Sequence, residues 1–255
     1  MSENVMIVYK PVSVTPLQCI DRIRKLYPRL QSTKIAYAGR LDPMAEGTLL
    51  LLLGEECKKR KEYESLEKTY EFEVLFGVST DTNDVMGMPT SPVIRSYIKE
   101  TYIRNLLPQL IGSYPQPYPA YSSARVQGKP LYWWAMRNRL NEIEIPKKQV
   151  DVTSLTLNNR RTITQRTILN IFEQKISPVI GNFRQTEILH AWHSLLTLNP
   201  SLSLPVYSFT AAVSSGTYIR SLAHTIGTLL DTHSLAFSIK RTAVGPYKIS
   251  SAIQV

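Results

Sequence analysis

The chain has 255 residues, 43% of them hydrophobic and 20% charged, and its formal net charge is +10; this is typical of a globular protein and excludes a disordered or fibrous one. The longest apolar run, Leu49–Leu53, is too short to span a bilayer, and the only cysteines, Cys19 and Cys57, form no CxxC pair. We therefore expect a cytoplasmic protein without a membrane segment, disulfide framework or zinc site, whose positive charge favours a polyanionic partner such as nucleic acid.

The first predicted elements are a short buried strand over 5–8 and a helix that opens at Thr15-Pro16. Thr15 can cap this helix, Pro16 suits its first position, and Gln18 completes a capping box. Residues at spacings of three and four predict its buried stripe: Leu17, Ile20, Ile23 and Leu26 or Tyr27.

Further along the chain the pattern alternates between strands and helices without a regular βαβ rhythm. Strands are expected over 49–53, 70–76, 150–157 and 206–213, and helices over 103–110, 130–135 and 219–230. A polar loop over 79–84 and a proline-rich extended segment over 115–119 separate some of them. This mixture favours an α+β fold over a doubly wound one.

The segment 34–47 carries the most prominent acid. Asp42 stands between Gly39 and Gly47 and directly before Pro43, which holds it in an extended or turn conformation. An ionised aspartate in a turn can act as a nucleophile or general base, and Arg40 could pair with it or with phosphates. The alternative is an aspartate that only closes the turn.

A second segment, 214–222, opens the last predicted helix. Gly216 breaks the preceding strand and Thr217 can cap the helix, which puts Tyr218 and Arg220 in its first turn. The helix dipole disfavours a cation there, so Arg220 either pairs with an anion or is an ordinary surface arginine.

A third segment, 118–132, interleaves aromatic and basic residues, as RNA-stacking surfaces require. Tyr121, Arg125 and Lys129 are the exposed candidates, with packing into the core as the alternative. His190 and His193 have no acid or cysteine at ligand spacing, so no metal is expected. The chain also lacks the GxGxxG, Walker and HExxH motifs, which leaves nucleotide-cofactor and zinc-protease classes without support.

In this order the segments resemble the TruB family of tRNA pseudouridine synthases over nearly the whole chain. The matching stretches are Lys10-Pro11, 39–47 (GRLDPMAEG), 68–70 (KTY), 77–87, 121–132, 215–222 (SGTYIRSL) and 239–246. The resemblance implies a single pseudouridine synthase domain over 1–255, with a mixed, largely antiparallel sheet flanked by helices and loops. It also implies isomerase activity on the T-loop uridine of tRNA (U55), by base flipping and without cofactor.

The resemblance also implies a role for each matched residue. Asp42 would be the catalytic aspartate, attacking the flipped uridine or abstracting a sugar proton after the glycosidic bond breaks. Arg220 would pair with Asp42, and Tyr70 would stack on the base and help remove the C5 proton. The residues implied in substrate binding are Tyr37, Arg40, Lys10, Tyr121, Tyr218, Ile239 and Lys129.

Three features depart from the family pattern. Tyr37 stands where the family has a histidine. Extra residues near 159–204 suggest a helical insert that either grips tRNA or adds support. The C-terminal RNA-binding PUA domain of the family is expected to be absent.

The expected partner is the T stem-loop of tRNA, bound by a monomer. The alternatives are a tRNA-folding chaperone without turnover and a Cbf5-type synthase directed by a guide RNA. The presence of Asp42, Tyr70 and Arg220 argues against the first alternative, and the expected lack of a C-terminal domain argues against the second.

Overall fold

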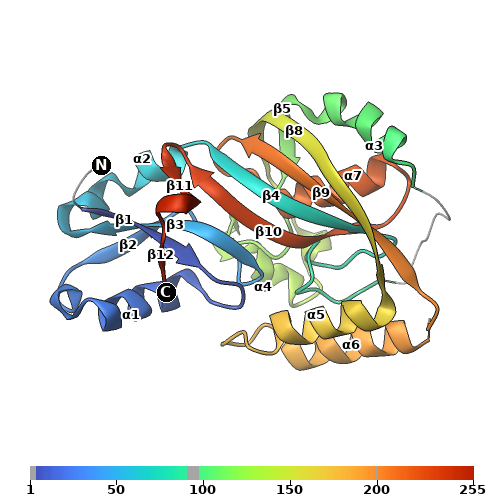
Figure 1. Ribbon diagram of the computed structural model, residues 1–255, viewed down its shortest axis with the longest axis horizontal. Coiled ribbons are helices and arrows are strands. Elements are labelled where there is room, and N and C mark those ends of the chain that lie inside the picture. The colour runs from blue at the N-terminus through green and yellow to red at the C-terminus, as the bar shows by residue number, and fades with distance from the viewer. Residues whose placement is uncertain (1–3, 91–97, 199) are drawn as a thin grey trace.

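The computed structural model describes residues 4–90, 98–198 and 200–255. Within them the structure is built around one large mixed sheet, beside a small two-stranded one (Figure 1). The strands are β1 Val5–Lys10, β2 Ile35–Ala38, β3 Ala45–Leu53, β4 Lys68–Phe76, β5 Gly112–Pro117, β6 Arg125–Val126, β7 Lys129–Pro130, β8 Lys147–Thr164, β9 Ser203–Val213, β10 Ser234–Val244, β11 Tyr247–Lys248 and β12 Ile253–Gln254. The α-helices are α1 Pro16–Leu26, α2 Arg60–Ser65, α3 Glu100–Leu106, α4 Leu131–Ala135, α5 Gln165–Ile176, α6 Gln185–Thr197 and α7 Ile219–Leu229. In the described part of the chain, no helix has the length and apolar character needed to cross a membrane.

The strand order of the main sheet is β12-β1-β3-β10-β4-β9-β8-β5, with β2 added on β3 and β11 on β10. The pairs β1–β12 and β3–β10 are parallel, whereas the pairs β1–β3, β10–β4, β4–β9, β9–β8 and β8–β5 are antiparallel. The expected α+β class with a mixed, largely antiparallel sheet is therefore confirmed. The prolines of the predicted extended segment, Pro115 and Pro117, lie in edge strand β5, where a missing N–H is tolerated.

Helix α1 has the predicted capping box, in which Thr15 accepts from the Gln18 backbone and the Gln18 side chain accepts from the Thr15 N–H. Its predicted stripe is wrong at the start, since Leu17 is 63% exposed. At the end, where Leu26 or Tyr27 was expected, Leu26 is exposed and Tyr27 is partly buried against the same cluster. The buried face consists of Cys19, Ile20 and Ile23. At 100° per residue, Leu17 points about 115° away from the centre of that face.

The helix expected over 103–110 is shorter than predicted, because α3 gives way to a 3-10 turn over Leu107–Leu110. Pro108 has no N–H to continue the α-helical hydrogen bonds. Helix α7 also begins differently: Tyr218 is its N-cap, and the Thr217 hydroxyl donates to the Ser214 carbonyl (2.9 Å) instead of capping the helix.

The ladder between β8 and β9 runs from Val152–Val213 to Thr164–Ser203, so residues 159–164, expected to begin a helical insert, are strand. The helical part is the hairpin of α5 and α6, which lies along the lower edge of the molecule in Figure 1. Phe172 of α5 contacts Trp192 of α6 (ring centroids 4.5 Å apart) and Phe237 of β10 (5.9 Å). The hairpin therefore shares the main hydrophobic core and is fixed to the sheet.

Candidate active site

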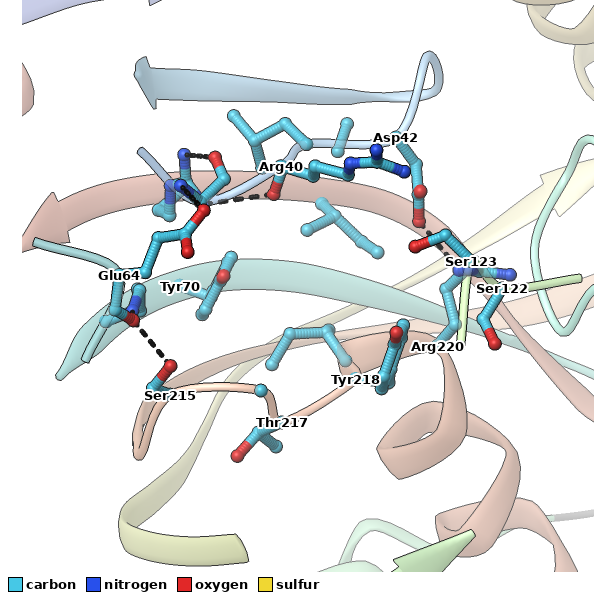
Figure 2. Close-up of a pocket in the computed structure, with 18 of the residues that line it drawn as sticks. Arg40, Asp42, Glu64, Tyr70, Ser122, Ser123, Ser215, Thr217, Tyr218 and Arg220 are labelled. Atoms are coloured by element: carbon cyan, nitrogen blue, oxygen red, sulfur yellow. Dashed lines mark hydrogen bonds and ion pairs between the residues drawn. The ribbon is translucent and has the colours of Figure 1, made fainter. Parts of the chain in front are cut away.

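A cavity of about 410 Å³ opens where the loop before β3 meets β4, β10 and the start of α7 (Figure 2). Its walls come from segments far apart in the sequence, and they include Arg40, Asp42, Lys68, Tyr70, Tyr121, Tyr218, Arg220, Ile239 and Arg241. A cavity of this volume is in the range that takes a small molecule or one extruded nucleoside.

The buried guanidinium of Arg241 fixes the loop that carries Asp42. Arg241 of β10 donates from Nε to the carbonyl of Thr48 (2.8 Å), from Nη1 to that of Arg40 (3.2 Å) and from Nη2 to that of Gly39 (3.1 Å). Gly47 pairs with Arg241 across the parallel strands, and a Cβ at Gly47 would lie 2.3 Å from the Arg241 carbonyl. The glycines of this segment therefore allow the close approach that fixes the loop.

We expect Arg241→Met to lower the free energy of unfolding by about 3 kcal/mol, because the carbonyls of Gly39, Arg40 and Thr48 would lose a charged donor. Urea denaturation followed by circular dichroism measures this loss, with the exposed Arg29→Met as the matched control. A loss of less than about 1 kcal/mol, the size of an ordinary surface change, would contradict the supporting role.

Lys10 supports the same loop from the other side. Its side chain is fully buried, and Nζ donates to the carbonyls of Val14 (2.6 Å), Pro11 (2.9 Å) and Pro43 (3.4 Å). Burial lowers the pKa of this lysine to about 8, and the Asp42 carboxylate is among the charges that oppose the shift. Lys10 does not line the cavity. Its ammonium joins the segment before α1 to the loop of Asp42, which is a structural role, and its contact with substrate stays a prediction.

Arg220, in the first turn of α7, lies directly beside Asp42 at the cavity (Figure 2). Its Nε lies 2.8 Å from Oδ2 of Asp42 and 3.4 Å from Oδ2 of Asp84, without a directed hydrogen bond from Nε, so charge attraction holds these contacts. Nη1 donates to the carbonyl of Thr82 (2.8 Å) and Nη2 to that of Tyr121 (3.4 Å). The side chain of Arg220 is 5% exposed, whereas that of Asp42 is 44% exposed. A fixed guanidinium thus orients an accessible carboxylate.

Asp84 is a functional candidate that the sequence interpretation missed. It is buried, accepts from the hydroxyl of Thr82 (2.7 Å) and the N–H of Met86 (2.8 Å), and shares Arg220 with Asp42. Burial raises the pKa of Asp84 to about 6, although the Arg220 charge opposes the shift. It lies in the quoted stretch 77–87, but the sequence interpretation gave it no role of its own.

We expect turnover to fall as the pH drops through about 6, because protonation of Asp84 removes one of the two carboxylates beside Arg220. Asp84→Asn should be slower than wild type and lose this acid limb, whereas Asp151→Asn, at an exposed site, should keep it. Single-turnover rates over a pH series measure the effect. Since the folded-state pKa is raised, the contribution of Asp84 to stability increases as the pH falls through the same range. An acid limb unchanged in Asp84→Asn would assign it to another group.

Lys68 is a second candidate that the sequence interpretation missed, although it lies in the quoted KTY stretch. It lines the cavity, and its ammonium donates to the carbonyls of Glu64 and Leu66. Burial lowers the pKa of Lys68 to about 8, and the neighbouring Arg241 charge adds to the shift. Its ammonium therefore adds to the positive charge of Arg241 at the cavity wall.

The remaining walls combine aromatic and apolar surface. Tyr70 of β4 and Ile239 of β10 are buried at the cavity, and their strands are paired. Tyr218 is held by an edge contact with Tyr118 (5.8 Å) and by Gln116, whose side chain accepts from its N–H and donates to its carbonyl. Such walls suit a flat, uncharged ring.

Seven of the ten predicted site residues line this cavity, and three do not. Lys10 is buried behind the loop, as described above. Tyr37 lies in β2, with the guanidinium of Arg60 over its ring (5.3 Å). Lys129 lies in β7, with its ammonium 5.6 Å from the ring of Trp133. Tyr37 and Lys129 could contact a substrate only outside the cavity.

The fold is similar to that of two solved structures. A superposition on the crystal structure of a Cbf5-Nop10-Gar1 complex has a TM-score of 0.61 at 17% identity and covers 99% of this chain and 52% of that chain. A structure of an H/ACA RNP bound to a substrate RNA gives a TM-score of 0.58 at 17% identity, over 98% of this chain and 50% of that chain. The chain thus shares the fold of these two structures over nearly its whole length.

Sequence comparison identifies the family. Residues 25–175 match the TruB family pseudouridylate synthase, N terminal domain. The tRNA pseudouridine synthase B of Bacillus velezensis is 30% identical over 250 residues, which cover 98% of this chain and 67% of that protein. The enzyme of the same name from Bacillus subtilis is 29% identical over 251 residues, again 98% of this chain and 67% of that protein. The chain belongs to the TruB family, which confirms the resemblance, and it spans about two thirds of these relatives.

Proposed function

We propose that this protein converts the T-loop uridine of tRNA, U55, into pseudouridine. The single observation that carries the proposal is the ion pair of Asp42 and Arg220 at the mouth of a cavity sized for one nucleoside. The names of its TruB relatives support tRNA as the substrate. The net charge of +10 supports binding to a polyanion.

The reaction is an isomerisation, so no co-reactant enters. The uridine leaves the stacked loop and enters the cavity, at a cost of a few kcal/mol that phosphate contacts and stacking offset. The bond between C1′ and N1 breaks, the uracil turns, and a bond between C1′ and C5 replaces it. The proton of C5 is lost and one returns to N1.

Asp42 either attacks the uridine or abstracts a sugar proton after the glycosidic bond breaks, and Arg220 keeps its charge balanced and its direction fixed. Tyr70 stacks on the uracil and takes part in removal of the C5 proton. Ile239 and Tyr218 form the walls around the ring. Arg40 and Tyr121, at the rim, contact the rest of the RNA.

The proposal extends to the whole chain as a single catalytic domain over 1–255, acting in the cytoplasm as a monomer and needing neither metal nor cofactor. Asp42 lies in the loop before β3 and Arg220 in α7, and the pairing of β3 with β10 helps to bring the two elements together. The site therefore needs both halves of the chain.

The test is to incubate the purified protein with an unmodified tRNA transcript, without guide RNA, and to map pseudouridine by carbodiimide primer extension. Product at the T loop is the expected result. Binding without product would indicate a folding chaperone, and product only after addition of a guide RNA would indicate a Cbf5-type synthase. Either result would overturn the proposal.

A further inference from the structure

The hairpin of α5 and α6 is the part of the structure that the proposed function does not use. Its connecting loop, residues 177–184, reaches the active site. A second cavity of about 270 Å³ is lined by Asp42 and Arg220 and also by Asn182, Phe183 and Arg184. The tip of the hairpin therefore lies within one small cavity of the Asp42–Arg220 pair.

One polar contact joins the hairpin to the loop of Asp42. Ser13 donates from its hydroxyl to the carbonyl of Lys175, near the end of α5 (2.6 Å). The N–H of the same Ser13 donates to the carbonyl of Pro43, the residue directly after Asp42 (2.8 Å). A single residue thus connects the hairpin to the turn that carries the carboxylate.

A second polar contact joins the hairpin to a segment that contacts Arg220, the other member of the ion pair. Arg184 donates from Nη1 to Oδ2 of Asp81 (2.8 Å) and from Nη2 to Oδ1 (3.3 Å), which is a two-point contact. Its guanidinium also lies over the ring of Tyr121, 4.4 Å from the centroid. Both side chains of the Arg184–Asp81 pair are partly buried, which limits solvent screening.

The two residues that Arg184 contacts, Asp81 and Tyr121, lie in the two segments whose carbonyls accept hydrogen bonds from Arg220. Asp81 directly precedes Thr82, whose carbonyl accepts from Arg220, and Tyr121 presents the other accepting carbonyl itself. Arg184 therefore links the two chain segments whose carbonyls bind the Arg220 guanidinium. It does not contact Arg220 and can act only through these segments.

The backbone at Arg184 supports a specific role for this residue. Its φ is 63°, in the left-handed region, where a residue with a Cβ is strained. Such strain persists where surrounding contacts over-determine the conformation. The contacts to Asp81 and Tyr121 are the ones that hold the side chain at this strained position.

We propose that Arg184 is a positioning residue, which orients Arg220 toward Asp42 by tying the Asp81–Thr82 segment to Tyr121. In this account the hairpin is a brace for the active site, with Ser13 as its contact on the Asp42 side. The effect on turnover rests on the proposed function, whereas the geometric effect on Arg220 does not.

The test uses Arg184→Asn, since asparagine tolerates the left-handed backbone but lacks the guanidinium. Single-turnover rates at saturating T stem-loop RNA should fall about tenfold, because a small misplacement of catalytic groups is costly. RNA affinity should stay within about twofold, since the account gives Arg184 no RNA contact. Arg166→Asn, on the exposed face of the same hairpin, should retain the wild-type rate.

The charge-swapped pair Arg184→Asp with Asp81→Arg should recover part of the rate that either single change loses, since the contact is restored in reverse. An unchanged rate in Arg184→Asn, or a loss confined to RNA affinity, would overturn the proposal. A purely structural role would lower the melting temperature without changing the rate well below it.

A second measurement does not depend on turnover. In the free protein, hydrogen exchange of the Arg220 Nε–H, followed by NMR, should be several-fold faster in Arg184→Asn than in wild type or Arg166→Asn. Equal exchange rates would overturn the positioning role. If wild type makes no pseudouridine, the proposed function fails while this measurement still decides the role of Arg184.

Discussion

Asp42→Asn is expected to reduce pseudouridine formation by about 10⁴-fold or more, because an amide is neither a nucleophile nor a base at neutral pH. The substitution keeps the size and shape of the side chain. Asp42 is 44% exposed, so its loss should leave the fold intact. The measurement is single-turnover product formation on unmodified tRNA.

RNA affinity of Asp42→Asn should stay within a few-fold of wild type, because phosphate contacts and stacking supply most of the binding energy. Filter binding measures it. Asp21→Asn, an exposed position on α1, is the matched control and should retain full activity. Product formation by Asp42→Asn at more than a few per cent of the wild-type rate would remove Asp42 from the chemical step.

Arg220→Lys has the second largest expected effect, a fall of about 10²-fold or more in the single-turnover rate. Lysine keeps the positive charge but lacks the planar fork. The guanidinium makes two ion pairs, with Asp42 and Asp84, and two hydrogen bonds, with the carbonyls of Thr82 and Tyr121. A single ammonium cannot occupy all of these positions, so the direction of the Asp42 carboxylate would be lost.

The matched control is Arg40→Lys, the same exchange at an exposed arginine of the same cavity. It should change RNA affinity by a few-fold at most and leave the saturated rate close to wild type, because its proposed contacts are with RNA outside the reacting base. An Arg220→Lys rate within about threefold of wild type would mean that charge alone suffices at this position.

The two groups of the ion pair could be proposed from local sequence, each for a physical reason. Asp42 stands before a proline and between glycines, which marks a constrained turn. Arg220 stands in the first turn of a helix, where the dipole disfavours a cation unless an anion is near. The structure supplies two anions there, Asp42 and Asp84.

The supporting residues could not be found in this way. Lys10 and Arg241 are charged, and a sequence interpretation places charged residues on the surface or against substrate. Both are buried, because three backbone carbonyls surround each of them and replace its hydration. No pattern in the sequence predicts that a charged side chain will be surrounded by backbone carbonyls of a distant loop.

The sequence alone determined the class of fold, most elements and the motif residues, because periodicity, capping and turn chemistry act over a few neighbouring positions. The tertiary structure alone decided which charges meet. Asp42 and Arg220 lie 178 positions apart, and only the pairing of β3 with β10 and the packing of α7 bring them within 2.8 Å. The same holds for Arg184 and Asp81, since a contact across the fold depends on the relative placement of whole elements and leaves no local pattern.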